Sequence, residues 1–321
     1  MKFYPSISQV PNDFGPSAVT IGKFDGLHAG HRSVIARLCG EAQAAGLVST
    51  VLTFDRNPLA LLRPESCPES LSSYEQKREV LGSTGVDALV MIKFTPEFAL
   101  MPAQVFVTEV LVRALRAKLV FVGPDFRFGH RGLGAVQQLK DLGKDHGFEV
   151  RMIEAVRPLG DRVISSSWIR DLLAKGLVAE AAVLLQRYST VRGVVVPGER
   201  RGRALGYPTA NLSQSVEGFV PADGVYAAYA SVNGKTMPAA VSIGNNPTFA
   251  GVRDKQIEAH LLDVDLDLYG STVEIAFVEY IRGMEKFASV DELVLQMTLD
   301  ESRVRELLGV TARTVPIGRR D

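Results

Sequence analysis

The chain has 321 residues, of which 36 are Lys or Arg, 36 are Asp or Glu, 46% are hydrophobic and 22% are charged. This length predicts two domains, and the equal numbers of charges argue against a general nucleic-acid-binding or membrane-surface protein. There is no apolar run of about 18 residues, no signal-peptide pattern at residues 1–16, and no CxxC pair, since Cys39 and Cys67 stand alone. We therefore expect a cytoplasmic protein without a membrane span, a zinc cage or a disulfide framework.

The first half of the chain alternates between strand-like and helix-like patterns. Apolar, β-rich runs occupy residues 18–24, 48–54, 87–94, 117–123 and 149–156. Helical patterns lie between them, at residues 31–46, 74–85, 102–115 and about 134–146. Strands that alternate with helices of this length predict an α/β domain, a Rossmann-like doubly wound parallel sheet. Ligands of such sheets bind beyond the carboxyl ends of the strands.

The second half of the chain has a different pattern. Helices near 166–175 and 178–186 are followed, from about 190 to 280, by short β-rich runs that Gly, Pro and Asn interrupt. Turn signals without intervening helices predict a small antiparallel β-barrel. A terminal helix is expected at 289–309, with Ser289 as its N-cap and buried contacts at Leu293, Met297, Val304, Leu307 and Leu308. We place the boundary near Arg187, which gives domains 1–186 and 187–321.

The stretch "GKFDGLHAGH" at residues 22–31 joins a strand to a helix and holds two of the five histidines, His28 and His31. Gly26 and Gly30 allow the backbone to approach a ligand closely. The amino end of the following helix favours phosphate, and the two imidazoles add donors and, if protonated, positive charge. A metal pair and two histidines in an exposed loop are the alternatives, although Asp25 alone does not complete a zinc site.

This stretch resembles the HxGH signature of the nucleotidylyltransferase superfamily, in the form carried by bacterial bifunctional riboflavin kinase/FAD synthetases. Other segments resemble the same family in the same order along the chain: "TFDRNP" (53–58), "VGPDFRFG" (122–129), "ISSSWIR" (164–170), "GRALGYPTANL" (202–212), "DGVYAA" (223–228), "SIGNNPTF" (242–249) and "EAHLLDVDLDLYG" (258–270). The resemblance implies an N-terminal domain that adenylylates FMN with ATP, giving FAD and pyrophosphate. It also implies a C-terminal domain that phosphorylates riboflavin to FMN, leaving ADP. Both reactions imply Mg²⁺, carried mainly by the nucleotide phosphates.

In the first domain, the resemblance implies that His28 and His31 donate to the ATP phosphates in the transition state. The other residues that it implies there are Gly22, Phe24, Asp25, Gly26, Gly30, Asn57, Asp125, Arg127, Ser165, Ser166 and Arg170. Among these, Asp125 belongs to the flavin-nucleotide site, and Arg127 is a candidate phosphate contact together with Arg131. Ser165 and Ser166 supply hydroxyls, and Arg170 clamps phosphate. Without the resemblance, serines before a helix indicate an N-cap. The family often has a histidine where Asn57 stands, and our hypothesis is that Arg56 supplies part of the missing positive charge.

In the second domain, "GYPTANL" places Thr209 and Asn211 on the same side of an extended segment. A hydroxyl and an amide carbonyl are hard oxygen ligands that suit Mg²⁺ on a nucleotide, and the resemblance implies this metal-binding role. A turn in which Asn bonds its own backbone is the alternative. Just upstream, glycines with Arg200, Arg201 and Arg203 suggest a flexible, basic loop over phosphate, or else a solvated run of charges. The nucleotide-binding residues expected here are Gly202, Arg203, Gly206 and Pro208.

The segment 256–270 is expected to be one strand, in which Asp263, Asp265 and Asp267 share one face. The opposite face carries Glu258 and His260 with three apolar side chains, and a carboxylate among apolar residues needs a partner or a function. An internal salt bridge would be one explanation. The resemblance implies that Glu258 is the general base for the 5′-hydroxyl of riboflavin.

The sequence therefore predicts a bifunctional enzyme whose partners are small molecules: riboflavin, FMN, FAD and ATP/ADP. We expect no nucleic-acid or membrane partner, and a weak homo-oligomer at most. A rival from the same superfamily would adenylylate a different acceptor. A rival of another class is a regulatory protein that binds flavin or nucleotide, with weakened adenylyl transfer, a reading that only Asn57 favours.

Overall fold

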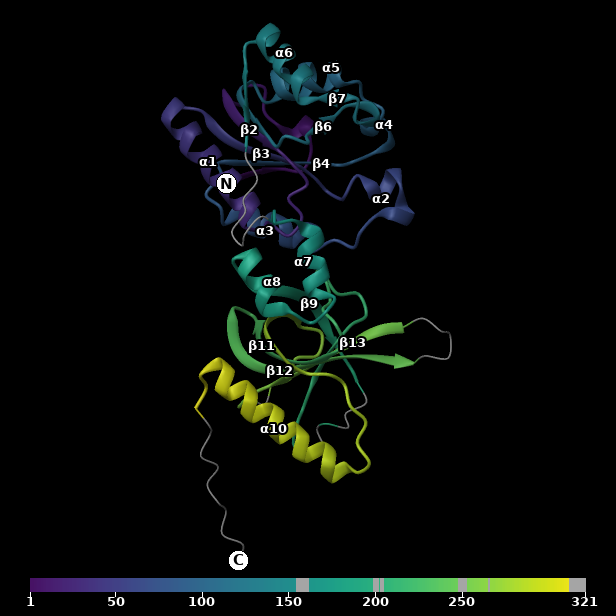
Figure 1. Cartoon of the computed structure of the whole chain (residues 1–321). Helices are drawn as coiled ribbons and strands as arrows, with labels where there is room; N and C mark the ends of the chain where they lie inside the picture. Colours follow the sequence, from purple (N-terminus) through teal and green to yellow (C-terminus); the bar gives the residue numbers. More distant parts are fainter. Residues whose placement is uncertain (154–161, 199–201, 203–204, 248–252, 265, 312–321) are drawn as a thin grey trace, which may run out of the picture. The chain divides into compact units, whose positions relative to one another are not determined.

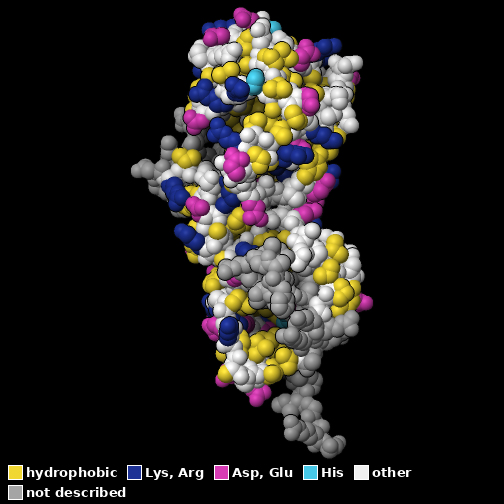
Figure 2. Space-filling model, turned by 90° about the vertical axis from the view of Figure 1, so that its right-hand side faces the viewer, with side chains coloured by type: hydrophobic (Ala, Val, Ile, Leu, Met, Phe, Trp, Pro, Cys, Tyr) yellow, Lys and Arg dark blue, Asp and Glu magenta, His cyan; other side chains and the backbone are white. Residues whose placement is uncertain are grey.

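The computed structural model describes residues 1–153, 162–198, 202, 205–247, 253–264 and 266–311. The chain divides into two compact units, Met1–Ser166 and Ser167–Asp321. Arg200, Arg201, Arg203 and Asp265 lie outside the described residues. On the face that Figure 2 shows, basic and acidic side chains are interspersed, as their equal numbers lead one to expect. Among the described residues, no helix is both long and apolar enough to cross a membrane.

The first unit contains a six-stranded sheet in which every pair of neighbours is parallel. In spatial order the strands are β1 (Lys2–Tyr4), β4 (Ala88–Ile92), β3 (Val48–Phe54), β2 (Ser17–Ile21), β5 (Ala117–Val122) and β8 (Glu149–Met152). The chain moves from β2 to β3 on one side and later returns to β5 on the other. The carboxyl end of β2 is therefore a topological switch point, where doubly wound sheets bind their ligands.

Helices cover both faces of this sheet, because alternate side chains of each strand point to opposite faces. Helices α1 (Ala29–Ala45) and α3 (Tyr74–Gly82) pack on the face of Ala18 and Val51. The π-type helix η3 (Phe106–Ala114) and α6 (Val136–His146) pack on the opposite face, that of Val19 and Leu52. The remaining elements are short: η1 (Ile7–Gln9), α2 (Leu59–Leu62), η2 (Pro64–Ser66), α4 (Pro96–Ala99), α5 (Ala103–Val105), β6 (Arg127–Phe128), η4 (His130–Gly132) and β7 (Gly134–Ala135).

The second unit is a closed antiparallel barrel. Its strands, in order around the barrel, are β10 (Ala210–Leu212), β13 (Arg253–Leu261), β12 (Lys235–Pro247), β11 (Gly224–Val232), β14 (Thr272–Arg282) and β9 (Ser189–Val196). Helix α7 (Ser166–Leu173), which starts at the last residue of the first unit, and α8 (Val178–Leu185) precede the barrel. The predicted α/β domain followed by a small barrel is confirmed.

Helix α10 (Val290–Leu308) lies along the barrel wall (Figure 1). Ser289 caps it as predicted, because the Ser289 hydroxyl accepts a hydrogen bond from the Glu292 amide. Val304 is fully buried against Ala227 of β11 and Leu262. The other predicted contacts of this helix, Leu293, Met297, Leu307 and Leu308, are half-buried.

The prediction of one strand over 256–270 is wrong, because β13 ends at Leu261. The chain turns there with Asp263 at φ 61°, a left-handed conformation that a strand cannot contain. The Asp263 carboxylate instead receives two hydrogen bonds from the Arg305 guanidinium of α10, at 2.9 and 2.7 Å. Asp263 and Asp267 therefore do not form a shared acidic strand face.

Candidate active sites

The loop after β2 has an unusual backbone. Phe24, Gly26 and Leu27 have positive φ angles of 47°, 75° and 42°. Phe24 and Leu27 are each only 2% exposed, so their burial in the α1-side core holds them in this costly conformation. Gly22 ends the strand, and its amide donates to the Leu52 carbonyl of β3. The loop is thus a rigid turn that places the N-terminus of α1 at the switch point of the sheet.

His28 is the N-cap of α1, since its Nδ1 accepts a hydrogen bond from the backbone amide of His31 at 3.4 Å. The helix thus begins at Ala29, two residues earlier than expected, and includes Gly30. The two imidazoles stack, with centroids 3.8 Å apart and planes 17° apart, and Phe24 meets His31 edge-on at 5.1 Å. An Nδ1 that accepts leaves the N–H of a neutral His28 ring on Nε2.

Burial lowers the pKa of His28 from 6.5 to about 4. Burial also lowers the pKa of His31 well below 6.5, and the neighbouring His28 and Lys77 lower it further. Both imidazoles are therefore neutral donors in the free protein, rather than the source of positive charge that protonation would give. Such donors at a helix N-terminus suit a polyphosphate, which the amide groups and the helix dipole also favour.

One other predicted residue, Ser166, contacts this loop. The Ser166 hydroxyl donates to the backbone carbonyl of Asp25 at 2.9 Å. The Asp25 carboxylate in turn accepts from the Leu71 amide at 2.9 Å. Ser166 is the first residue of α7, and Ser165 lies half-buried directly before it. The structure therefore brings Ser166 to the histidine loop.

Lys77 is a residue of this region that the sequence motifs did not single out. Lys77 is only 8% exposed. Its ammonium donates a hydrogen bond to the Phe54 carbonyl, at the end of β3, over 3.2 Å. A lysine four residues before the buried Leu81 lies on the core-facing side of α3. That position was the available signal, since lysine is almost never fully buried without a partner.

The other predicted residues of the first domain are less closely grouped. Asn57 lies at the start of α2, where its Oδ1 accepts from the Leu59 amide at 3.2 Å. Asp125 and Arg127 are exposed, the latter on β6. Arg170 lies on α7, and its guanidinium donates to the Ser167 hydroxyl at 3.3 Å. None of the hydrogen bonds described for these four side chains reaches the two histidines.

A second cluster lies in the barrel, where β10 and β13 run antiparallel with Asn211 directly opposite Glu258. Asn211 Nδ2 donates to Thr209 Oγ1 at 3.5 Å, and Thr209 Oγ1 donates to Glu258 Oε2 at 3.4 Å. Gln256, which the motifs did not single out, donates from Nε2 to Asn211 Oδ1 at 3.0 Å. Four side chains thus form one chain of hydrogen bonds that includes both predicted metal ligands and the predicted base.

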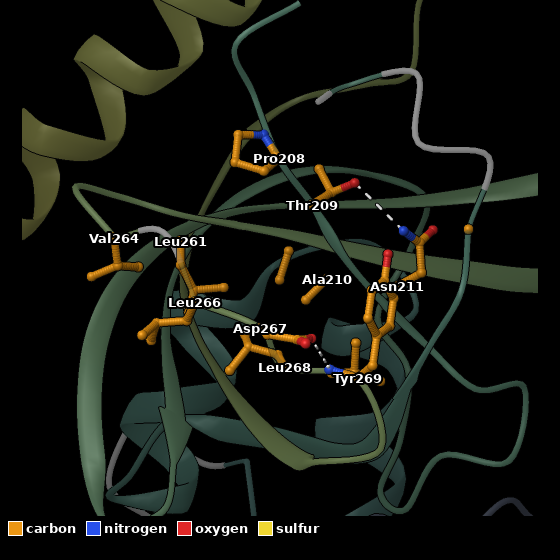
Figure 3. A pocket seen from close by; sticks show the side chains of 13 residues that line it. Pro208, Thr209, Ala210, Asn211, Leu261, Val264, Leu266, Asp267, Leu268 and Tyr269 are labelled. Carbon is orange, nitrogen blue, oxygen red and sulfur yellow. Dashed lines mark hydrogen bonds between the residues drawn. The ribbon is translucent and has the colours of Figure 1, made fainter. Parts of the chain in front are cut away.

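Two cavities adjoin this chain of hydrogen bonds, and Thr209 and Asn211 line both. One has a volume of about 190 Å³ and is bounded by Leu266, Asp267 and Tyr269 (Figure 3). The other, of about 470 Å³, is lined by Glu258, by barrel residues and by residues of α10. The Thr209 hydroxyl and the Asn211 amide are therefore shared by both cavities, whereas the Glu258 carboxylate lines only the larger one.

The glycines and the proline of this region have identifiable structural roles. A Cβ atom at Gly202 would collide with the Tyr207 carbonyl, while Gly206 has a φ of 86°. The Pro208 carbonyl accepts from His260 Nδ1 at 2.8 Å, which sets the His260 tautomer. These contacts hold the segment before Thr209 close to β13.

The larger cavity has a charged pair at its rim. The Arg282 guanidinium makes three hydrogen bonds to the Asp300 carboxylate of α10, at 2.7 to 3.1 Å, and both residues line the cavity. Gln296 also donates to Asp300, at 2.9 Å. This group ties α10 to the end of β14 next to the opening.

Comparison with protein-family models gives two matches that divide the chain as the two units do. A model described as FAD synthetase matches residues 10–168, and one described as riboflavin kinase matches residues 185–308. Curated relatives from two bacteria are each described as a bifunctional riboflavin kinase/FMN adenylyltransferase. That of Escherichia coli strain K12 is 38% identical over 95% of this chain and 96% of its own length. That of Bacillus subtilis strain 168 is 34% identical over 89% of this chain and 90% of its own length.

A solved structure shares the fold over the whole chain. It is described as a macrolide-efflux protein from Streptococcus pneumoniae and is 31% identical, with a TM-score of 0.83. The match covers 95% of this chain and 99% of that one.

Proposed function

The chain belongs to the family of bifunctional riboflavin kinases/FMN adenylyltransferases, and we propose how its residues divide the two reactions. It phosphorylates riboflavin with ATP to give FMN, and it adenylylates FMN with ATP to give FAD. We assign adenylyl transfer to residues 1–186 and riboflavin phosphorylation to residues 187–321. The observation that carries the assignment is the pair of residue clusters, one at a helix N-terminus beyond a parallel sheet and one between two barrel cavities.

In adenylyl transfer, an oxygen of the FMN phosphate attacks the α-phosphorus of ATP and pyrophosphate leaves. Because the attacking group is already an anion, the protein needs no nucleophile of its own. Its task is to align two anions and to stabilise the charge that develops on the α-phosphate. His28 and His31 supply neutral N–H donors at this point, and the first amides of α1 add backbone donors. Ser165, Ser166, Arg170, Asp125 and Arg127 complete the contacts to nucleotide and flavin.

In riboflavin phosphorylation, the ribityl 5′-hydroxyl attacks the γ-phosphorus of ATP and ADP leaves. We place the flavin in the 470 Å³ cavity, where Glu258 can accept the hydroxyl proton, and the nucleotide in the 190 Å³ cavity. The γ-phosphate then lies at the shared wall, beside Thr209 and Asn211. Positioning and electrostatic stabilisation contribute most to such transfers, so the base adds to an already aligned pair.

The donor set at the shared wall suits Mg²⁺. The Thr209 hydroxyl, the Asn211 carbonyl and the Glu258 carboxylate offer only oxygen, the atom that this cation prefers. Thr209 and Asn211 would hold the metal, which when bound neutralises charge on the nucleotide phosphates. The Gln256 amide, which now donates to Asn211 Oδ1, would hold that carbonyl in place.

The cellular setting follows from the chemistry. Both reactions use ATP and flavins, so we place the protein in the cytoplasm. We propose that it acts as a monomer or a weak homo-oligomer, with small molecules as its partners. We do not propose macrolide efflux, the activity in the description of the structural neighbour. The two residue clusters are suited to phosphate and flavin chemistry, and they carry the proposal.

One experiment tests this function. The protein is incubated with riboflavin, ATP and MgCl₂, and FMN and FAD are separated by chromatography. A parallel sample starts from FMN, and another contains EDTA. We expect FMN to precede FAD in the first sample, FAD alone in the second and neither product with EDTA. Formation of FMN that stops there would restrict the function to the kinase, and no flavin product at all would favour a binding protein.

A further inference from the structure

The strongest unexplained feature of the first unit is the buried cation on α3. Lys77 is 8% exposed, whereas the side chain of its neighbour Arg78 is 41% exposed and pairs with Glu75. Burying an ammonium costs free energy unless hydrogen bonds and charges compensate for the lost water. The surroundings of Lys77 therefore indicate what it is for.

The Lys77 ammonium lies where the carboxyl ends of two strands meet. It donates to the Phe54 carbonyl, the last residue of β3, at 3.2 Å. The carboxylates of Asp25, after β2, and Asp55, after β3, both act to raise the pKa of Lys77, against the larger effect of burial, which lowers it. The ammonium is thus bonded to the end of β3 and attracted by carboxylates of the loops after β2 and β3.

Each of these carboxylates in turn fixes another part of the site. Asp25 Oδ1 accepts from the Leu71 amide, and Asp55 Oδ1 accepts from the Phe94 amide, both at 2.9 Å. The Asp25 backbone carbonyl also receives the Ser166 hydroxyl. One buried charge therefore joins the loops after β2 and β3 with the segments that carry Leu71 and Phe94.

His31 lies next to this charge. The Lys77 ammonium is one of the causes that lower the pKa of His31, and no hydrogen-bond partner of the buried His31 Nδ1 occurs among the described residues. An ammonium has only donors, so it cannot accept a hydrogen bond from an N–H group of the imidazole ring. Its charge disfavours the imidazolium form and leaves the neutral donor.

We propose that Lys77 is a positioning residue for adenylyl transfer, whose buried ammonium fastens the loops after β2 and β3 beneath His31 so that the imidazole meets the ATP phosphates in one place. This proposal rests on the proposed adenylyl transfer at the histidine pair. Lys77 acts through His31 and the Asp25 loop, and its ammonium need not touch the substrate.

Several charged or titratable groups surround this arrangement. His28 and Arg32 lie on either side of His31 at the start of α1, Asp25 and Asp55 face the ammonium, and Tyr74 on α3 interacts with Asp55. The exposed Arg56 guanidinium also pairs with the Asp55 carboxylate, at 3.1 Å. Among the groups that lower the pKa of His31, Lys77 is the only permanent cation. Loss of its charge therefore raises the pKa of His31.

The test compares Lys77→Met and Lys77→Arg with Arg78→Met, which removes an exposed charge from the same helix. FAD formation from FMN is measured from pH 5 to 9, riboflavin phosphorylation is measured in the same samples, and the ring signals of His31 are titrated by NMR. We expect Lys77→Met to lower kcat for FAD formation at least tenfold, with KM for ATP changed less. Riboflavin phosphorylation should stay within twofold, and the His31 titration should move to higher pH.

The two other variants make the outcome decisive. Lys77→Arg keeps the charge, so it should keep the parent's His31 titration even where the larger side chain slows the reaction, and Arg78→Met should resemble the parent in both activities. Unchanged FAD formation and an unmoved His31 titration in Lys77→Met would overturn the proposal. If Lys77→Met does not fold, a His31 titration shifted in Lys77→Arg would overturn it too. A parent protein that makes no FAD would refute the proposed function instead, while the His31 titration would still test the role of Lys77.

Discussion

The imidazole ring of His28 lies flat against that of His31, with ring centroids 3.8 Å apart. Two imidazolium ions at this separation would repel each other, and the N-terminus of α1 disfavours a cation as well. The two rings therefore cannot both be protonated, and burial, which lowers both pKa values, keeps the pair neutral at neutral pH. This arrangement has consequences for stability and for catalysis.

Acid should destabilise the first unit through His28. Its pKa is about 4 in the folded protein, against an ordinary 6.5, so the unfolded chain binds more protons between these values. Stability therefore falls as the pH drops from 6.5 towards 4, by about 3 kcal/mol for this group, and levels off below. Hydrogen exchange of peptides that cover β2 and α1 measures this loss. In His28→Asn, which keeps a good N-cap without a titrating group, the loss should be smaller by that amount. The same acid loss in both proteins would show that His28 is not its cause.

Removal of a histidine donor should lower one activity and spare the other. His31→Ala removes the N–H group that we propose donates to the α-phosphate, and loss of one such donor typically costs 10²- to 10³-fold in rate. We expect FAD formation from FMN to fall by about 10²-fold while riboflavin phosphorylation stays unchanged. His146→Ala, at the end of α6, is the matched control. A loss of FAD formation below threefold would contradict a role for His31 in the transition state.

The sequence predicted the site best where the structure depends on residues that are neighbours in the chain. The strand, turn and helix around His28 follow from local periodicity and glycine positions. The end of β13 could not be predicted in this way, because it depends on Asp263 pairing with Arg305, 42 residues further on. The role of Lys77 was missed for the same reason, since the groups around its ammonium are distant in sequence. They are the Phe54 carbonyl at the end of β3 and the carboxylates of Asp25 and Asp55 in the loops after β2 and β3. Contacts distant in sequence decided both cases.

Arg56 should contribute charge to the first site without contributing much to stability. Its side chain is 62% exposed and pairs with Asp55, and exposed pairs of this kind are worth about 0–1 kcal/mol. In Arg56→Ala we expect kcat/KM for ATP in FAD formation to fall about three- to tenfold at low salt, and by less at high salt, which screens an exposed charge. Arg113→Ala, which removes another exposed and paired arginine, should have no such effect. Unchanged turnover of FMN to FAD in Arg56→Ala would rule out this role for Arg56.

Glu258 should be required for only one of the two reactions. Its carboxylate accepts from Thr209 Oγ1 at 3.4 Å and lines the larger cavity, so it can take the proton of a hydroxyl held there. Glu258→Gln keeps the shape of the side chain and its link to Thr209 but cannot act as a base at neutral pH. We therefore expect riboflavin phosphorylation to fall at least tenfold, within the usual range for general-base removal of about 10²- to 10⁴-fold. FAD formation from added FMN should be spared. Glu274→Gln on β14, which only breaks an ion pair with Arg192, is the control. Equal loss of both activities in Glu258→Gln, or loss of neither, would contradict two separate sites, because Glu258 lies in the second unit and the histidine pair in the first.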